Sequence, residues 1–167
     1  MEKIRLLHNI GLRINSNYNT REEVLACSDI LTFDGVYQSV WMNRDVLKGK
    51  RIVLFVMGNY IGGDNKFDVG MPYEKYCTQE QIDDLVGDFG AEVGWHTWSH
   101  KNLCTLSDEE AMKEMTPPTP MRYLAYPYGN VDERIATLAK RVGFEGAYSV
   151  VQGNDSDFQR NRAYLNW

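Results

Sequence analysis

The feature that most constrains this chain is a series of short apolar runs, rich in β-branched and aromatic residues. Each run is four to six residues long, which suits a buried strand and is too short for a helix. The runs cover residues 4–7, 30–33, 52–57, 91–94, 123–126 and 147–151. We therefore predict six strands.

Several of the segments between these runs carry the signals that start and end helices. Thr, Ser or Asp stands before a polar, helix-forming stretch at four places, where it can cap a helix N-terminus. The expected N-caps are Thr20, Thr78, Ser107 and Asp132, and the expected C-cap glycines are Gly90 and Gly143. Strands that alternate with helices predict an α/β fold with a mostly parallel sheet, open or closed into a barrel.

Length and composition describe an ordinary globular protein. With 167 residues, we treat 1–167 as a single domain with one core. The 18 Lys and Arg residues against 23 Asp and Glu residues give a net charge of −5, which argues against nucleic acid as a partner. The three cysteines form no CxxC pair. No apolar stretch has the length of a membrane span or signal peptide, so we expect a cytoplasmic protein.

Candidate functional residues stand at the ends of four of the predicted strands, where the functional groups of parallel sheets gather. His96 and His100 are four residues apart, so both can face one ion from a single turn. Asp34 ends another strand, and two imidazoles with one carboxylate form the ligand set of many catalytic metal sites. Taken singly, the histidines could pack or cap a helix, and Asp34 with Gly35 could be a turn.

Three motifs in this order resemble those of the NodB-homology polysaccharide deacetylases, the family 4 carbohydrate esterases. The first is Leu31-Thr32-Phe33-Asp34-Gly35, the second is His96-Thr97-Trp98-Ser99-His100, and the third is Tyr126-Pro127-Tyr128-Gly129. The chain resembles a short, divergent member of that family. The resemblance implies a distorted, incomplete (β/α) barrel and a substrate that is an acylated amino sugar or polysaccharide.

The same resemblance implies roles for single residues. His96 and His100 match the family's metal-binding histidines, and we assign Asp34 as the third ligand of a divalent metal, with zinc the expected ion. The backbone amide of Tyr128 matches the donor that stabilises the oxyanion. Tyr126 and Arg162 are our candidates for substrate binding, and Arg162 could instead orient a carboxylate in the site.

The chain departs from the family pattern in its proton-transfer groups. The family has two adjacent aspartates in its first motif, the first a general base, whereas this chain has Asp34 alone, which could also stand in the base position. Ala125 stands where an arginine that pairs with the base is often found. No histidine follows His100, so His8 is our candidate for proton transfer; a purely structural hydrogen-bonding role is equally open.

Three functions follow from these observations. The first is a metal-dependent hydrolase that removes an N-acetyl or N-formyl group from an amino sugar or polysaccharide. The second is a catalytically silent relative that binds metal and carbohydrate but has lost the base. The third uses the fold as a scaffold, with structural histidines. Further candidates for the base, should the chain be an enzyme, are Asp64, Asp68 and Glu92.

Overall fold

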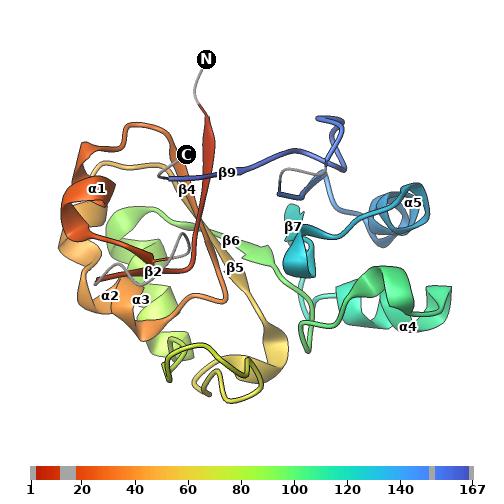
Figure 1. Ribbon diagram of the computed structural model, residues 1–167, viewed down its shortest axis with the longest axis horizontal. Coiled ribbons are helices and arrows are strands. Elements are labelled where there is room, and N and C mark those ends of the chain that lie inside the picture. The colour runs from red at the N-terminus through yellow and green to blue at the C-terminus, as the bar shows by residue number, and fades with distance from the viewer. Residues whose placement is uncertain (1–2, 12–17, 151–152, 166–167) are drawn as a thin grey trace.

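The computed structural model describes residues 3–11, 18–150 and 153–165 (Figure 1). Its centre is a seven-stranded sheet in the order β8-β7-β6-β5-β4-β1-β9, and all of its recorded strand pairs are parallel. The strands are β1 (Ile4–Leu7), β4 (Ile30–Asp34), β5 (Ile52–Val56), β6 (Glu92–Trp95), β7 (Tyr123–Ala125), β8 (Gly146–Tyr148) and β9 (Ala163–Tyr164). The six predicted strands are confirmed, although the last one ends earlier than expected, and Val151 lies outside the described residues.

Five α-helices are described; the N-caps expected from the sequence begin four of them, and the expected glycines end two, α3 and α5. The helices are α1 (Arg21–Ala26), α2 (Gln38–Met42), α3 (Gln79–Phe89), α4 (Asp108–Met115) and α5 (Glu133–Val142). Thr20, Thr78 and Ser107 form capping boxes, and the Asp132 side chain accepts a hydrogen bond from the Ile135 N–H. None of the helices described is long and apolar enough to cross a membrane.

Three short strands and one helix were not predicted. α2 begins without a side-chain cap, so it carries no start signal in the sequence. β2 (Asn9–Ile10) and β3 (Tyr18–Asn19) form a separate parallel pair, and each is two residues long, as is β9. Pairs of residues this short show no periodicity, which explains why the sequence did not indicate them.

The two faces of the sheet have different contents because side chains alternate along each strand. On β5, Leu54 packs with the helices in the main core, whereas Val53 and Phe55 belong to a second cluster on the concave face, together with Ala125 and Tyr148. β5 is buried on both faces, and its sequence is accordingly an unbroken apolar run.

The segment 160–164 lies across the gap between the two edges of the sheet. The backbone of Arg160 forms a β-bridge with Tyr148, the last residue of β8, and β9 pairs with β1. This course is visible in Figure 1, where β9 runs from the α5 side of the molecule to β1. The sheet therefore curls into an incomplete barrel, which confirms the predicted fold class: α/β, a distorted and incomplete (β/α) barrel of the NodB-homology type.

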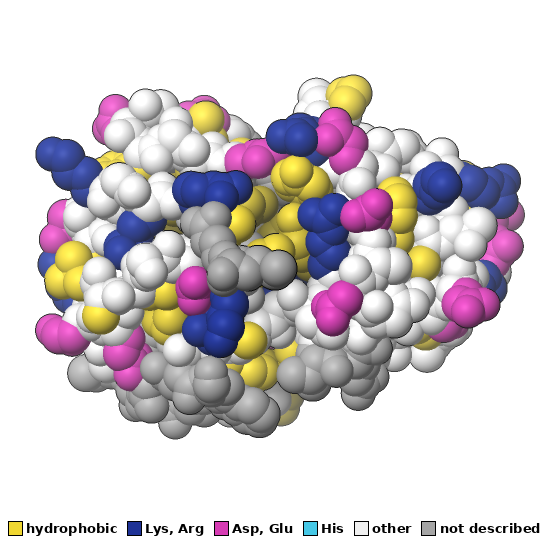
Figure 2. Space-filling view, turned by 90° about the horizontal axis from the view of Figure 1, so that it is seen from above, with side chains coloured by type: hydrophobic (Ala, Val, Ile, Leu, Met, Phe, Trp, Pro, Cys, Tyr) yellow, Lys and Arg dark blue, Asp and Glu magenta, His cyan; other side chains and the backbone are white. Residues whose placement is uncertain are grey.

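Surface charges are mixed on the face seen from above. In Figure 2 the Lys and Arg side chains are interspersed with Asp and Glu, and apolar side chains lie between them. A mixed surface of this kind is what the net charge of −5 leads us to expect.

Candidate active site

A cavity of about 340 Å³ opens at the carboxyl ends of the central strands. Six residues singled out from the sequence line it: His8, Asp34, Asp68, His96, His100 and Tyr128. The alternation of side chains explains why three of them meet there. His8, Asp34 and His96 each follow by two positions a residue on the concave face of a strand, so they point into the same space. Gly94, two before His96, leaves room for Phe55, whose ring a Cβ there would meet at 2.5 Å.

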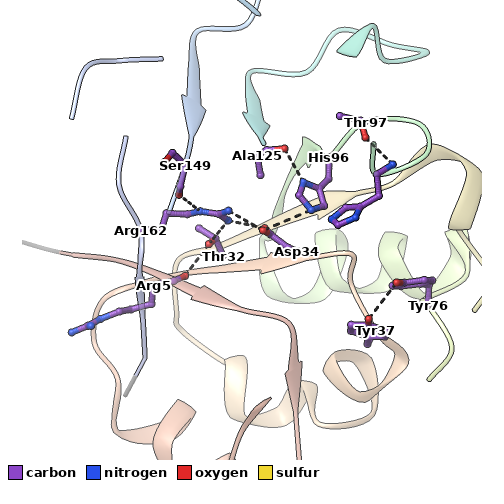
Figure 3. Close-up of polar contacts among 11 residues, drawn as sticks. Arg5, Thr32, Asp34, Tyr37, Tyr76, His96, Thr97, Ala125, Ser149 and Arg162 are labelled. Carbon is purple, nitrogen blue, oxygen red and sulfur yellow. Dashed lines mark hydrogen bonds and ion pairs between the residues drawn. The ribbon is translucent and has the colours of Figure 1, made fainter. Parts of the chain in front are cut away.

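Asp34 is held by a buried arginine from the far end of the chain. Its Oδ1 accepts a hydrogen bond of 2.6 Å from Arg162 Nη1, and its Oδ2 accepts one of 2.8 Å from Nη2 (Figure 3). Arg162 also donates to the Thr32 hydroxyl and the Ser149 carbonyl. Burial alone would raise the pKa of Asp34, but the nearby charges and hydrogen bonds, chiefly those of Arg162, outweigh it and hold the pKa below its usual range. Asp34 is therefore a carboxylate at neutral pH.

His96 is oriented by a backbone carbonyl. Its Nδ1 lies 2.7 Å from the carbonyl oxygen of Ala125, and because that oxygen can only accept, Nδ1 carries the proton. The lone pair is then on Nε2, which lies 3.8 Å from Asp34 Oδ2. Burial lowers the pKa of His96 and keeps the ring neutral. A neutral imidazole whose other nitrogen is fixed by a carbonyl is the usual state of a metal-binding histidine.

His100 lies beside His96 at the end of a strained turn. Their ring centroids are 4.8 Å apart. Thr97 and His100 have positive φ angles of 69° and 56°, a conformation that costs non-glycine residues about 1–3 kcal/mol each and must be held by neighbours. The Thr97 hydroxyl accepts a hydrogen bond from the His100 N–H. His100 Nδ1 is buried and has no hydrogen-bond partner among the described residues.

His8 is half-buried and lines the cavity. Its Nδ1 also has no hydrogen-bond partner within the described part of the chain. Burial lowers the pKa of His8 to about 4, with Asp34 opposing the shift and His96 adding to it. His8 is therefore neutral at pH 7. It can accept a proton on its free ring nitrogen, and it can act as a general acid only after it has been protonated.

The donor atoms around the cavity fit a divalent metal by type and in part by spacing. Two ligands about 2.1 Å from a tetrahedral ion lie about 3.4 Å apart, close to the 3.8 Å between His96 Nε2 and Asp34 Oδ2. The partnerless Nδ1 of His100 agrees with a ligand role. However, no three His, Cys, Asp or Glu side chains among the described residues already surround one ion position. Closing the set therefore requires side-chain movement.

Tyr128 lines the cavity beside His100. It lies in a tight turn (Pro127–Gly129) with a positive φ of 60°, and its side chain is 63% exposed. The hydrogen bonds of this turn use the N–H groups of Gly129 and Asn130 rather than that of Tyr128. The Tyr128 ring packs edge-on against His100, with centroids 4.6 Å apart.

Tyr126 and Arg162, our two candidates for substrate binding, are not placed for direct contact with a substrate. Tyr126 is fully buried in the core beside the helices, and its hydroxyl donates to the Phe158 carbonyl. It has the same parity as Leu124, which packs in the same core, so alternation along β7 points it away from the cavity. Arg162 is 1% exposed and its guanidinium is engaged by Asp34. We correct both assignments, and Arg162 instead orients the carboxylate.

Of the three further carboxylates considered as bases, one lines the cavity and two do not. Glu92 begins β6, at the end of the strand away from the cavity, and pairs with Arg122. Asp64 pairs with Lys66. Asp68 alone of the three lines the cavity, and its carboxylate has no hydrogen bond or ion pair among the described residues. Burial raises its pKa.

Three tyrosines that sequence reasoning missed, Tyr18, Tyr37 and Tyr164, also line the cavity. Tyr37 stacks on Tyr76, with ring centroids 4.6 Å apart.

The position of Asp68 at the cavity could have been predicted from the strand order. Its segment follows β5 and must therefore leave the sheet at the edge that holds the cavity. Tyr18 has no such signal, since it lies in a two-residue strand.

Several solved structures share this fold, and two of the three described here are named as deacetylases. IcaB from Ammonifex degensii has a TM-score of 0.75 at 17% identity, over 98% of this chain and 92% of that one. The Streptococcus pyogenes deacetylase PplD, in complex with acetate, has a TM-score of 0.70 at 15% identity, over 97% and 91%. A de-N-acetylase from Aggregatibacter actinomycetemcomitans has a TM-score of 0.64 at 11% identity, over 98% and 94%. The TM-scores establish a shared fold, and at identities this low they establish the fold alone.

The family itself is established by sequence. A comparison with curated proteins finds no match. The family model described as polysaccharide deacetylase matches residues 28–147, which is most of the chain and includes all three motifs. By this match, the chain belongs to the polysaccharide deacetylase family.

Proposed function

We propose that the protein is a metal-dependent hydrolase that removes an N-acetyl or N-formyl group from an amino sugar or polysaccharide. Membership of the polysaccharide deacetylase family supports acyl hydrolysis on a carbohydrate. The similarity to a de-N-acetylase supports an amide rather than an ester as the bond that is cleaved. The divalent ion, expected to be zinc, and a cytoplasmic location remain predictions.

The observation that carries this proposal is the state of the two histidines. The Ala125 carbonyl leaves the His96 Nε2 lone pair directed at the Asp34 side of the cavity, and His100 brings a buried nitrogen that has no partner in the described structure. Burying a polar nitrogen without a partner costs about 1–3 kcal/mol. The partnerless nitrogen of His100, beside the His96 lone pair and the Asp34 carboxylate, is explained by an ion that all three side chains would bind.

Asp34 can serve as the third ligand while it pairs with Arg162. A carboxylate has about four lone-pair sites, and Arg162 uses one on each oxygen. Ligating carboxylates are commonly hydrogen-bonded in this way by outer groups. When bound, a zinc-type ion supplies Lewis-acid polarisation of the amide carbonyl and a more acidic water. The N–H of Tyr128 is the donor that we assign to the oxyanion.

Proton transfer falls to His8 and Asp68. Asp34 is a poor base because both of its oxygens accept hydrogen bonds from Arg162, whose charge also lowers its pKa. His8 is neutral at pH 7 and faces the cavity, so it can accept a proton and return it to the leaving amine. Asp68 lies at the same cavity, has no partner cation among the described residues, and is the second candidate for the base.

A specific observation supports the alternative function, a silent metal- and carbohydrate-binding relative. Arg162 places a positive charge on both oxygens of the motif carboxylate, which weakens Asp34 as a base and competes with an ion for it. In this alternative the cavity binds the acylated sugar between its tyrosine side chains without turnover.

Metal analysis of the purified protein tests the site. We expect about one zinc or similar ion per chain after reconstitution, and its loss in His96→Ala. Ser149→Ala serves as a control because Ser149 is equally buried but outside the ligand set. Absence of bound metal in the reconstituted wild type would overturn the site and the proposed chemistry.

Acetate release then separates enzyme from binder. We expect the metal-loaded protein to release acetate from N-acetylglucosamine oligomers. His8→Ala and Asp68→Asn test the two candidates for proton transfer, and the variant that removes the group in use should lower kcat by about 10²–10⁴. A metal-loaded protein that binds these oligomers without releasing acetate would support the silent binder.

A further inference from the structure

Glu114 is a buried carboxylate in the last turn of α4, outside the cavity. It is 9% exposed. A carboxylate is unfavourable both in the interior and at the C-terminal end of a helix, where the partial charge of the helix dipole is negative. The helix itself therefore gains nothing from Glu114, and its role must come from the groups it contacts.

Those contacts are all with the turn that carries the histidine pair. Glu114 Oε2 accepts a hydrogen bond of 2.9 Å from the Ser99 N–H, and Oε1 accepts one of 2.5 Å from the Ser99 hydroxyl. Lys101 Nζ lies 3.5 Å from Oε1. The Glu114 carbonyl accepts from the Trp98 N–H and the Trp95 indole. One residue of α4 thus fixes both the backbone and a side chain immediately before His100.

This turn needs external support because its backbone is strained. Thr97 and His100 both have positive φ angles, and neither is glycine. On one side Gly58 and Asn59 donate to the Thr97 and Trp98 carbonyls, and on the other side Glu114 binds Ser99. Without Glu114, residues 99–100 lose the contacts that hold them from the α4 side. The orientation of His100 would then depend only on the Thr97 hydroxyl and on the rings of His96 and Tyr128.

We propose that Glu114 is a positioning residue that sets the orientation of His100 through Ser99 and thereby the metal affinity of the site. The metal clause rests on the function proposed above. Removal of groups that orient metal ligands from outside typically lowers metal affinity about 10–100-fold. Glu114→Ala is expected to fall in this range, and Ser99→Ala, which removes one of the two hydrogen bonds, is expected to lose less.

Zinc titration of the folded variants tests the metal clause. Glu114→Gln retains an oxygen for the Ser99 N–H, so it should recover most of the affinity that Glu114→Ala loses. Glu109→Gln, an exposed glutamate on the same helix, should bind zinc like the wild type. If Glu114→Ala and Ser99→Ala bind zinc as tightly as the wild type, the proposal is wrong.

Nuclear magnetic resonance of the metal-free protein tests the positioning clause independently. We expect the ring signals of His100 to shift in Glu114→Ala while those of His8 stay in place, with the shift largely reversed in Glu114→Gln. Unchanged His100 signals in a folded Glu114→Ala protein would overturn the inference. A wild-type protein that binds no zinc but shows the His100 shift would instead contradict the proposed function and leave the positioning role supported.

Discussion

The cavity has a carboxylate wall, which carries Asp34, and a histidine wall, which carries His96 and His100. A buried cation holds the first wall and a buried anion holds the second, and the contacts that support the two walls differ in kind. On the β4 side, the buried cation of Arg162 holds Asp34 across 128 residues of sequence. On the β6 side, the buried anion of Glu114 holds the turn at Ser99 across 15 residues, and tryptophan rings pack around it. The carboxylate wall therefore depends on one long-range ion pair, whereas the histidine wall depends on several local hydrogen bonds and on packing.

This difference predicts how each wall fails. Removing one half of a buried ion pair leaves the other half charged and unpaired, so the loss is large and concentrated in one residue. A turn supported by several hydrogen bonds loses a smaller amount with each one. Substitutions in the two walls should therefore differ in magnitude.

The largest effect should come from Arg162→Met, which leaves the Asp34 carboxylate buried without a cation. We expect a loss of about 3–5 kcal/mol in the free energy of unfolding, measured by urea denaturation. Arg160→Met is the matched control, because Arg160 pairs with an exposed aspartate, Asp157, in the same segment. Its loss should be about 1 kcal/mol or less. Equal losses in the two variants would contradict the comparison.

Gly58→Ala should have the next largest effect, on the histidine wall. A Cβ at Gly58 would meet the Trp95 ring at 2.6 Å and the Trp98 ring more closely still. Overpacking of this kind costs about 1–3 kcal/mol. Gly87→Ala in α3 is the control, because its Cβ meets no atom within 4 Å and should stabilise the helix by about 0.5–1 kcal/mol. Urea denaturation gives both values, and near-ultraviolet circular dichroism should report the tryptophan change only in Gly58→Ala.

Thr97→Val should have a smaller effect. It retains the shape of the side chain but removes the hydroxyl that accepts from the His100 N–H. We expect a loss of about 1 kcal/mol and faster amide exchange at His100. Thr137→Val removes an exposed hydroxyl that donates to a helix carbonyl and should be nearly neutral. If His100 exchange is unchanged, the Thr97 hydroxyl does not support the turn.

The smallest effect should come from a half-buried counterpart of the Arg162 pair. Arg5 donates to Asp29, and this hydrogen bond, with one from the Lys3 N–H, lowers the pKa of Asp29. Its contribution is present above the unfolded pKa of about 3.9 and is lost as the pH falls through the lower folded pKa. Between pH 7 and pH 3, the wild type should lose up to about 0.5 kcal/mol more stability than Asp29→Asn. A larger difference in stability loss would mean that solvent does not weaken this half-buried pair relative to the buried Asp34–Arg162 pair.

Most of the fold could be predicted from the sequence because its signals are local. Apolar runs located β1, β4 and β5, and capping residues such as Thr78 and Gly90 located helix ends to the residue. What escaped were elements without a local pattern, above all β9, whose two residues are placed by pairing with β1 and by the preceding bridge to Tyr148.

The candidate site divides in the same way. The motif histidines and Asp34 were found because each follows a strand, and two-residue alternation brings them to one cavity. The same alternation, applied to β7, would have removed Tyr126 from the list. The Asp34–Arg162 pair could only be raised as a possibility, because nothing in the sequence near Arg162 marks the strand end it meets.

The Asp34–Arg162 pair also fixes the order in which the site can be assembled during synthesis. Asp34 leaves the ribosome 128 residues ahead of the arginine that neutralises it. A nascent chain that has already formed β1 to β8 holds the two histidines but lacks the cation for Asp34. Since chains fold from their N-terminal end as they are made, the cavity reaches its final charge balance only after the strands around it are complete.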